Sequence, residues 1–98
     1  MKTAVQFLNV AKDTLEARGV TYDSPEGERS MQATVEAFNV ITGRERKGTG
    51  LSEAEGWLFM QVLKDVRQWQ KEEYHEDSAL DALAYAALKA ESLAGGGK

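Results

Sequence analysis

Hydrophobic residues recur every three or four positions along most of this 98-residue chain, the spacing that places them on one face of an α-helix. The first stretch with this pattern runs from Thr3 to Arg18, and Gly19 follows where a left-handed C-terminal cap would lie. Its apolar face consists of Ala4, Phe7, Leu8, Ala11 and Leu15. The pattern therefore predicts an amphipathic first helix.

A second helical stretch is expected after a loop. Ser24 before Pro25 is a favourable helix start, but Gly27 weakens the first turn, so we expect regular helix from about Glu28 to Thr42.

The connection after this helix, residues 43–50, carries three glycines and the basic segment Arg44–Lys47. It lacks the Gly-Lys-Ser/Thr ending of a nucleotide phosphate loop and does not follow a strand, which excludes that motif. We expect a mobile connection, with a partner-contacting basic loop as the alternative.

Ser52 opens a third stretch, and Glu55 three residues later completes a capping box. Apolar residues then surround most of the helix: Trp57, Leu58, Phe59, Met60, Val62, Leu63 and Val66. A helix that is hydrophobic nearly all round lies at the centre of its bundle or is buried in an oligomer. We therefore expect this helix to be central in its bundle or buried in an oligomer, and the need to bury it suggests self-association, most simply as a homodimer.

The fourth helix is expected to start at Asp77 or Ser78 and to run to about Leu93, with six alanines that favour helix strongly. No stretch alternates with the period of two that marks a strand. The prediction is an all-α, four-helix, mostly antiparallel bundle that forms a single domain over residues 1–94, followed by a flexible tail at 95–98.

Composition narrows the functional classes. The chain is 42% hydrophobic and 29% charged and has no cysteine, which excludes disulfides and thiolate chemistry. Its net charge of −4 argues against a general nucleic-acid binder. No apolar run reaches the length of a membrane span or a signal peptide, so we expect a soluble, cytoplasmic protein with no membrane partner.

Lys64 and Arg67 share one face of the third helix because they lie three residues apart. They could bind a phosphate, with the guanidinium of Arg67 offering two parallel donors. The alternative is a solvated face paired with neighbouring acids.

Asp77, Asp81 and Tyr85 repeat every four residues and form one polar ridge on the fourth helix. Two carboxylates at this spacing can hold a divalent cation. The competing interpretation is structural, because Ser78 and Asp81 also fit a capping box and acids near a helix N-terminus are stabilised by its dipole.

Two further groups are candidates for ligand binding. His75, the only histidine, lies among acids in the link before the fourth helix, where it is a surface residue or a general base. Tyr22 lies in the loop after the first helix, where it either closes the mouth of a pocket or packs on the bundle.

These residues together carry a family resemblance over roughly residues 15–92. The motifs are Arg18-Gly-x-x-Tyr22-Asp-x-Pro25-Glu, Lys64-x-x-Arg67 and His75-x-Asp77-Ser78-x-x-Asp81-x-x-x-Tyr85-Ala-Ala-Leu. They resemble a small phage and prophage domain family of unknown function, which in turn looks like the all-α nucleoside-triphosphate pyrophosphatases of the MazG type.

That resemblance implies an oligomeric helical bundle that binds Mg²⁺ through acidic side chains and cleaves a nucleotide between its α and β phosphates. Asp81 matches the aspartate of the second acidic motif, and Asp77 lies one position off that motif's glutamate. The first acidic motif is missing, because Lys64 and Arg67 stand about where its glutamates would be. The chain therefore resembles a degenerate pyrophosphatase that would bind a nucleotide or another phosphorylated anion.

Two other hypotheses remain. The chain could be a non-enzymatic phage accessory protein that binds a host protein through the Arg44–Lys47 loop, Trp69 or the acidic Glu72–Asp77 link. Alternatively, Lys64, Arg67, Asp77 and Asp81 could form an interhelical salt-bridge network that needs no ligand.

Overall fold

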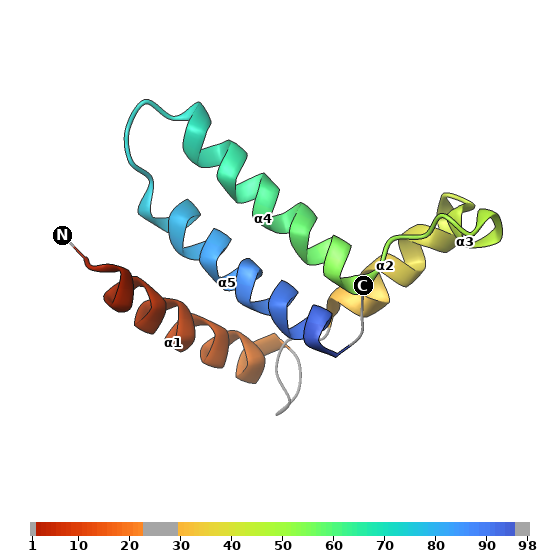
Figure 1. The fold of residues 1–98 in the computed structure, drawn as a ribbon, viewed down its shortest axis with the longest axis horizontal. Coiled ribbons are helices and arrows are strands. Elements are labelled where there is room, and N and C mark those ends of the chain that lie inside the picture. Colours follow the sequence, from red (N-terminus) through yellow and green to blue (C-terminus); the bar gives the residue numbers. More distant parts are fainter. Residues whose placement is uncertain (1, 23–29, 96–98) are drawn as a thin grey trace.

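The computed structural model describes residues 2–22 and 30–95, with the backbone alone for residues 19–22. These residues form helices and no strand, which confirms the all-α prediction (Figure 1). The helices are α1 (Ala4–Tyr22), α2 (Ser30–Ile41), α3 (Arg44–Lys47), α4 (Glu53–Gln70) and α5 (Glu76–Ala94). The described part of the chain therefore holds five helices, where the sequence pattern predicted four.

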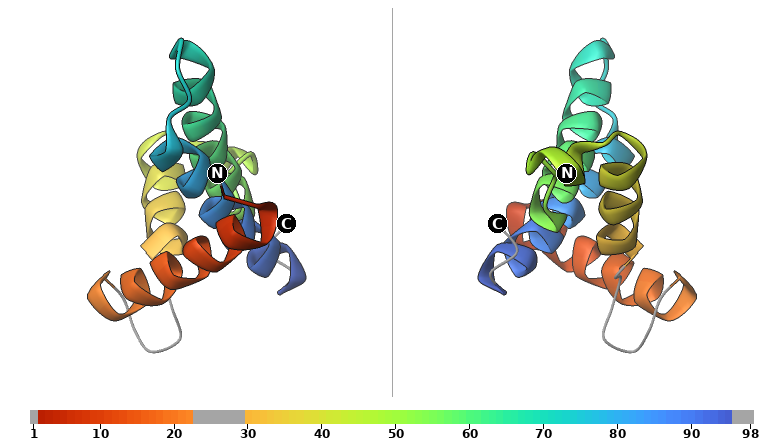
Figure 2. Two further views of the ribbon diagram at one scale, coloured as in Figure 1. Left: turned by 90° about the vertical axis from the view of Figure 1, so that its left-hand side faces the viewer. Right: turned by 90° about the vertical axis from the view of Figure 1, so that its right-hand side faces the viewer.

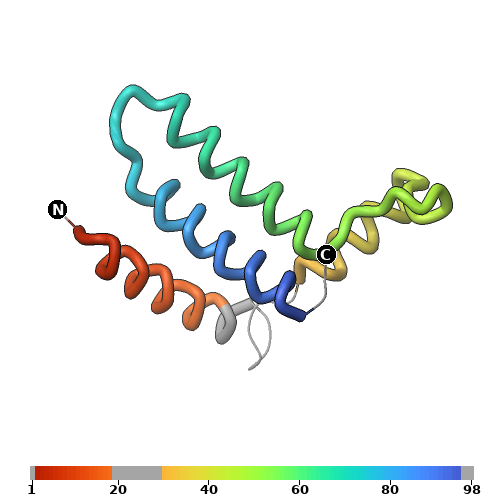
Figure 3. Tube along the Cα trace, viewed as in Figure 1, coloured from red at the N-terminus to blue at the C-terminus, as the bar shows by residue number. Residues whose placement is uncertain are grey.

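The helices form an open bundle, a layer in which α5 lies between α4 and α1 (Figure 1). α4 and α5 pack side by side as an antiparallel hairpin, and α1 packs on the other side of α5 (Figures 1 and 3). α1 crosses α5 at an angle (Figure 2), and α2 extends away from the start of α4 (Figure 1). The principal extents are 49 × 34 × 22 Å.

The central helix is α5, not the helix that begins after Ser52. α5 contacts both α4 and α1, whereas α4 contacts α5 on one side and α2 near its start. Ser78, Ala84, Tyr85 and Leu88 are buried along α5. Of the two alternatives for the most hydrophobic helix, a central place in its own chain is therefore not the one observed, because small alanines let α5 receive a neighbour on each side.

The start of α4 confirms the predicted capping box. The hydroxyl Oγ of Ser52 accepts a hydrogen bond from the Glu55 N–H at 3.1 Å, and Oε1 of Glu55 accepts one from the Ser52 N–H at 2.9 Å. Two N–H groups that a helix start leaves without partners are thereby satisfied.

α5 begins one residue earlier than expected, at Glu76, and its N-cap is His75 and not Asp77 or Ser78. Nδ1 of His75 accepts a hydrogen bond from the Ser78 N–H at 3.3 Å and lies 2.6 Å from the Ser78 hydroxyl. The N–H of His75 donates to Oε1 of Gln68 at 3.0 Å, which ties the cap to the end of α4. The predicted capping box of Ser78 and Asp81 does not form, because Ser78 already lies inside the helix.

The connection after α2 contains the short helix α3, where the sequence predicted a mobile loop. Gly43 and Gly48 flank it with φ of 76° and 70°, the left-handed region that favours glycine. Asn39 holds the end of this connection, because its side-chain amide donates to the Leu51 carbonyl at 2.9 Å and accepts from the Leu51 N–H at 2.8 Å.

One other boundary differs from the sequence pattern, because α1 continues past Gly19 to Tyr22. α2 is described from Ser30, and its expected start near Glu28 lies outside the described residues. The predicted start at Ser24 and Pro25 lies outside the described residues.

The core is small and lies where α4, α5 and α1 meet. Trp57, Tyr85 and Leu88 are its buried members, and Leu15, Met31 and Met60 pack against them. α2 reaches this core through the close approach of Met31 and Val35 to Gly56 of α4, where an added Cβ would lie 2.5 Å from Sδ of Met31 and 2.8 Å from Cγ1 of Val35. Gly56 therefore sets the α2–α4 contact.

One ion pair links the segment before α1 to the start of α5. Nζ of Lys2 lies 2.9 Å from Oε1 of Glu76, at the first turn of α5. The hydrogen bond and the charge of Glu76 raise the pKa of Lys2 above its ordinary value. Within the described ranges, none of the helices has the length and apolar content needed to cross a lipid bilayer.

Candidate functional site

One predicted pair of charges does meet across the hairpin. Nζ of Lys64 on α4 lies 3.0 Å from Oδ2 of Asp81 on α5, and the two side chains are 15% and 33% exposed. The pair lies at the α4–α5 contact, where a partly buried carboxylate and ammonium satisfy each other.

Tyr85, one turn after Asp81, lies in an aromatic cluster. Its ring stacks on Trp57 with 5.7 Å between centroids and 24° between planes. The Arg18 guanidinium carbon lies 5.2 Å from the centre of the Tyr85 ring, and a guanidinium nitrogen donates to the Tyr85 hydroxyl at 3.5 Å. α1, α4 and α5 therefore meet at one cationic and aromatic junction.

The other two predicted charges do not join this pair. Arg67 and Asp77 are exposed, and neither forms an ion pair with another residue of the described chain. Asp77 instead lies in the first turn of α5, where its charge complements the helix dipole.

The resemblance implies Mg²⁺ held by acidic side chains, among them Asp77 and Asp81. Asp81 is occupied by the Lys64 ammonium at 3.0 Å, and a second cation beside it would be repelled. Within residues 2–22 and 30–95, no three His, Asp or Glu side chains lie close enough together to hold a metal ion. With Asp81 paired to Lys64, the residues as arranged here do not fit the implied metal.

His75 and Tyr22 complete the predicted set. His75 is half-buried, with Nδ1 engaged in the cap of α5, so its ring has a structural task in this arrangement. The side chain of Tyr22 lies outside the described residues.

The outer face of α4 is the most exposed apolar surface of the hairpin. We define it by Phe59, Val62, Val66 and Trp69, which are 68%, 48%, 45% and 87% exposed. These positions lie 3, 4 and 3 residues apart, so they line one side of the helix. Beyond Trp69 lies a shallow hollow of about 350 Å³ at the hairpin end, to which the exposed Tyr74 also contributes.

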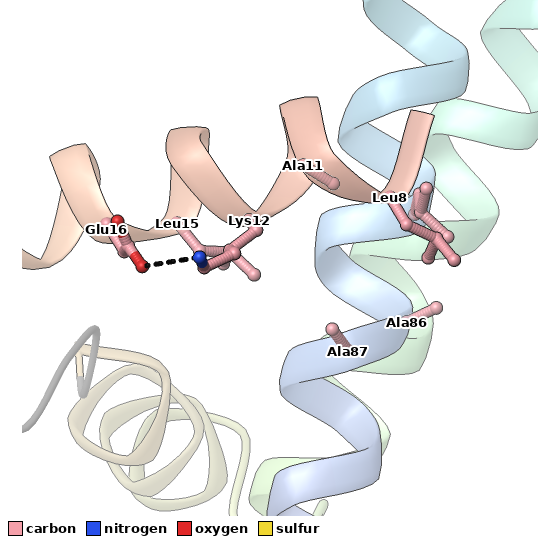
Figure 4. A pocket seen from close by; sticks show the side chains of 8 residues that line it. Leu8, Ala11, Lys12, Leu15, Glu16, Ala86 and Ala87 are labelled. Atoms are coloured by element: carbon pink, nitrogen blue, oxygen red, sulfur yellow. Dashed lines mark ion pairs between the residues drawn. The ribbon is translucent and has the colours of Figure 1, made fainter. Parts of the chain in front are cut away.

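A second apolar surface lies between α1 and α5. Leu8, Ala11 and Leu15 of α1 face Ala86 and Ala87 of α5 across an open groove of about 480 Å³ (Figure 4). An ion pair of 3.9 Å between Lys12 and Glu16 borders it. The groove is lined almost entirely by carbon, so it offers hydrophobic contact and little polar recognition.

Sequence reasoning missed Arg18 and Trp57 as partners of Tyr85. Both contacts join residues far apart in the chain, and no local spacing encodes them. The sequence did contain a signal for the exposed side of α4, because a helix that is hydrophobic all round has more apolar surface than a single neighbour can cover.

Comparison of the chain with protein-family models, curated proteins and solved structures yields no match.

Proposed function

We propose that this chain is a helical protein-interaction module and that the outer face of α4 is its binding surface. The observation that carries the proposal is the exposure of Phe59 and Trp69 on a helix whose opposite side holds the buried Trp57. Apolar patches that remain exposed mark interaction sites, and large aromatic side chains dominate the energy of protein interfaces.

In this proposal the Lys64–Asp81 pair has a structural role in the α4–α5 hairpin. Its 3.0 Å contact fixes the register of α4 against α5 and so keeps the outer face of α4 turned away from the core. The resemblance to phage domains supports a setting in which a small accessory protein acts by binding another protein, without chemistry of its own.

Site-specific photo-crosslinking in cells tests this function. A benzophenone amino acid in place of Trp69 should produce a crosslinked protein adduct, whereas the same amino acid in place of Val5, an exposed valine on α1, should give far less. An adduct with any protein, including another copy of this chain, supports an interaction surface. Equal adduct yields at the two positions, or none at Trp69, would refute the proposal.

A second candidate function is the binding of a nucleotide or another phosphorylated anion. The observation that favours it is the junction where the Arg18 guanidinium lies over Tyr85, one turn from the Lys64–Asp81 pair. An anion that bound there would compete with Asp81 for the Lys64 ammonium.

A thermal-shift and pyrophosphate-release assay with a panel of nucleoside triphosphates, with and without Mg²⁺, tests this second candidate. Binding should raise the unfolding temperature, and Lys64→Met should abolish the shift because it removes the cation. The absence of a shift with every nucleotide in the wild-type protein would rule this function out.

A further inference from the structure

Apolar side chains line both sides of α4, and within the described residues only one side is covered. Trp57 and Met60 pack in the core beside α5, and Lys64 pairs with Asp81 on the same side. At about 3.6 residues per turn, Val62 and Val66 fall on the opposite side of the helix. α4 lies at the edge of the layer (Figure 1), and its second hydrophobic face is exposed.

The total surface of the chain is larger than a compact monomer needs. A folded monomer of this mass exposes roughly 5,500 Å², whereas this chain exposes 6928 Å². Its radius of gyration is 14.8 Å, against roughly 12.6 Å for a compact domain of this length. A surface larger than a compact monomer needs is expected of a chain that buries part of it against a partner.

The pattern of the outer face suits a copy of itself. Its 3-4-3 spacing is that of a two-helix seam, in which each helix supplies both the knobs and the holes. In an antiparallel pair, Phe59 of each copy would lie opposite Trp69 of the other, and Val62 would lie opposite Val66. Every layer of the seam would then join side chains of matching size.

Helix dipoles favour the same antiparallel arrangement. Two antiparallel α4 helices place the positive N-terminal end of each dipole beside the negative C-terminal end of the other.

We propose that the partner of the outer face of α4 is a second copy of this chain, packed antiparallel along α4 about a twofold axis. This inference rests on the proposed interaction function and names its partner. The contact is isologous, so each subunit uses the same patch and the assembly closes as a dimer. The dimer buries the aromatic residues that the single chain leaves in water.

Sedimentation equilibrium of the purified full chain tests this inference. The wild-type protein should show twice the 10.8 kDa mass of the chain. Val62→Glu should weaken association by at least about 100-fold, because it places a carboxylate in the apolar seam. The matched control is Val5→Glu, the same change at an exposed valine on α1, which should leave the mass doubled. A monomeric wild-type protein, or equal effects of the two variants, would overturn the inference.

Cysteine pairing tests the orientation without requiring a stable monomeric variant, since the chain has no cysteine of its own. After mixing and mild oxidation, Phe59→Cys and Trp69→Cys chains should form a disulfide-linked heterodimer, and neither should link efficiently to itself. Efficient linkage of each variant to itself would indicate parallel helices and would contradict the proposed arrangement.

The photo-crosslinking experiment separates failure of the inference from failure of the proposed function. An adduct at position 69 that consists of two copies of this chain supports both. An adduct with a different protein overturns the dimer while the interaction function stands, and the absence of any adduct removes both.

Discussion

Two residues that the sequence marked as candidates for ligand binding make structural contacts in this protein. Asp81 meets Lys64 at 3.0 Å, and His75 caps α5. In each case a polar group that could serve a ligand is already engaged by a neighbour in the chain.

The Lys64–Asp81 pair makes a prediction about stability. Asp81→Asn should lower the free energy of unfolding by about 1–2 kcal/mol, because it leaves a largely buried ammonium without its counter-charge. The double replacement Lys64→Met with Asp81→Leu should cost less than Asp81→Asn alone, since no orphan charge remains. Urea denaturation measures both, with the exposed Asp65→Asn as a control. Equal losses for Asp81→Asn and Asp65→Asn would contradict the pairing.

The cap of α5 makes a second prediction. His75→Ala should lower the free energy of unfolding by about 1 kcal/mol, because the Ser78 N–H loses its side-chain acceptor. His75→Asn should retain most of that stability, since its side-chain oxygen can accept the same bond. Thermal unfolding of the two variants side by side provides the measurement. If alanine and asparagine have the same effect, the cap contributes nothing.

At this scale the sequence predicted some contacts and missed others for a physical reason. The i to i+3 relation of Ser52 and Glu55 is local, so the capping box could be foreseen. The contact of Arg18 with Tyr85 depends on how α1 crosses α5, which no local spacing determines.

At the scale of elements, hydrophobic periodicity located the four long helices, because burial of one face is what stabilises a helix in a protein. Hydrophobic periodicity could not show which of these helices lies between the others in the fold. Apolar content indicated the helix after Ser52, whereas the small side chains of α5 place that helix between two neighbours. The turn α3 was missed because a single turn is too short for a periodic pattern to develop.

The α2–α4 contact can be tested at Gly56. Gly56→Ala should destabilise the protein by about 1–3 kcal/mol despite the better helix propensity of alanine, because the new methyl group would overlap Met31 and Val35. Met31→Ala in the same chain should relieve part of this cost, so the two changes should be non-additive. Chemical denaturation of the double-mutant cycle measures the coupling. A stabilising Gly56→Ala would show that α2 does not pack against α4 as described.

At the scale of the whole molecule, the open layer explains why a chain of ordinary composition has so small a core. One side of α4 and the groove between α1 and α5 remain apolar and exposed. An assembly that covers the outer face of α4 would supply the burial that the single chain lacks.

Coverage of the outer face of α4 by a second copy predicts that thermal stability depends on protein concentration. The unfolding temperature of the wild-type protein should rise with concentration, because folded subunits are stabilised by their association. The unfolding temperature of Val62→Glu should be lower and nearly independent of concentration. Differential scanning calorimetry over a hundredfold concentration range provides the measurement, with Val5→Glu as the control that should follow the wild-type protein.

Iodide quenching of tryptophan fluorescence tests the central claim most directly, because Trp57 is buried and Trp69 reports on the outer face of α4. In concentrated wild-type protein, both tryptophans should be shielded, and dilution or Val62→Glu should open one of them to the quencher. A fluorescence fraction that iodide reaches equally at every concentration and in both proteins would show that no second copy covers this face.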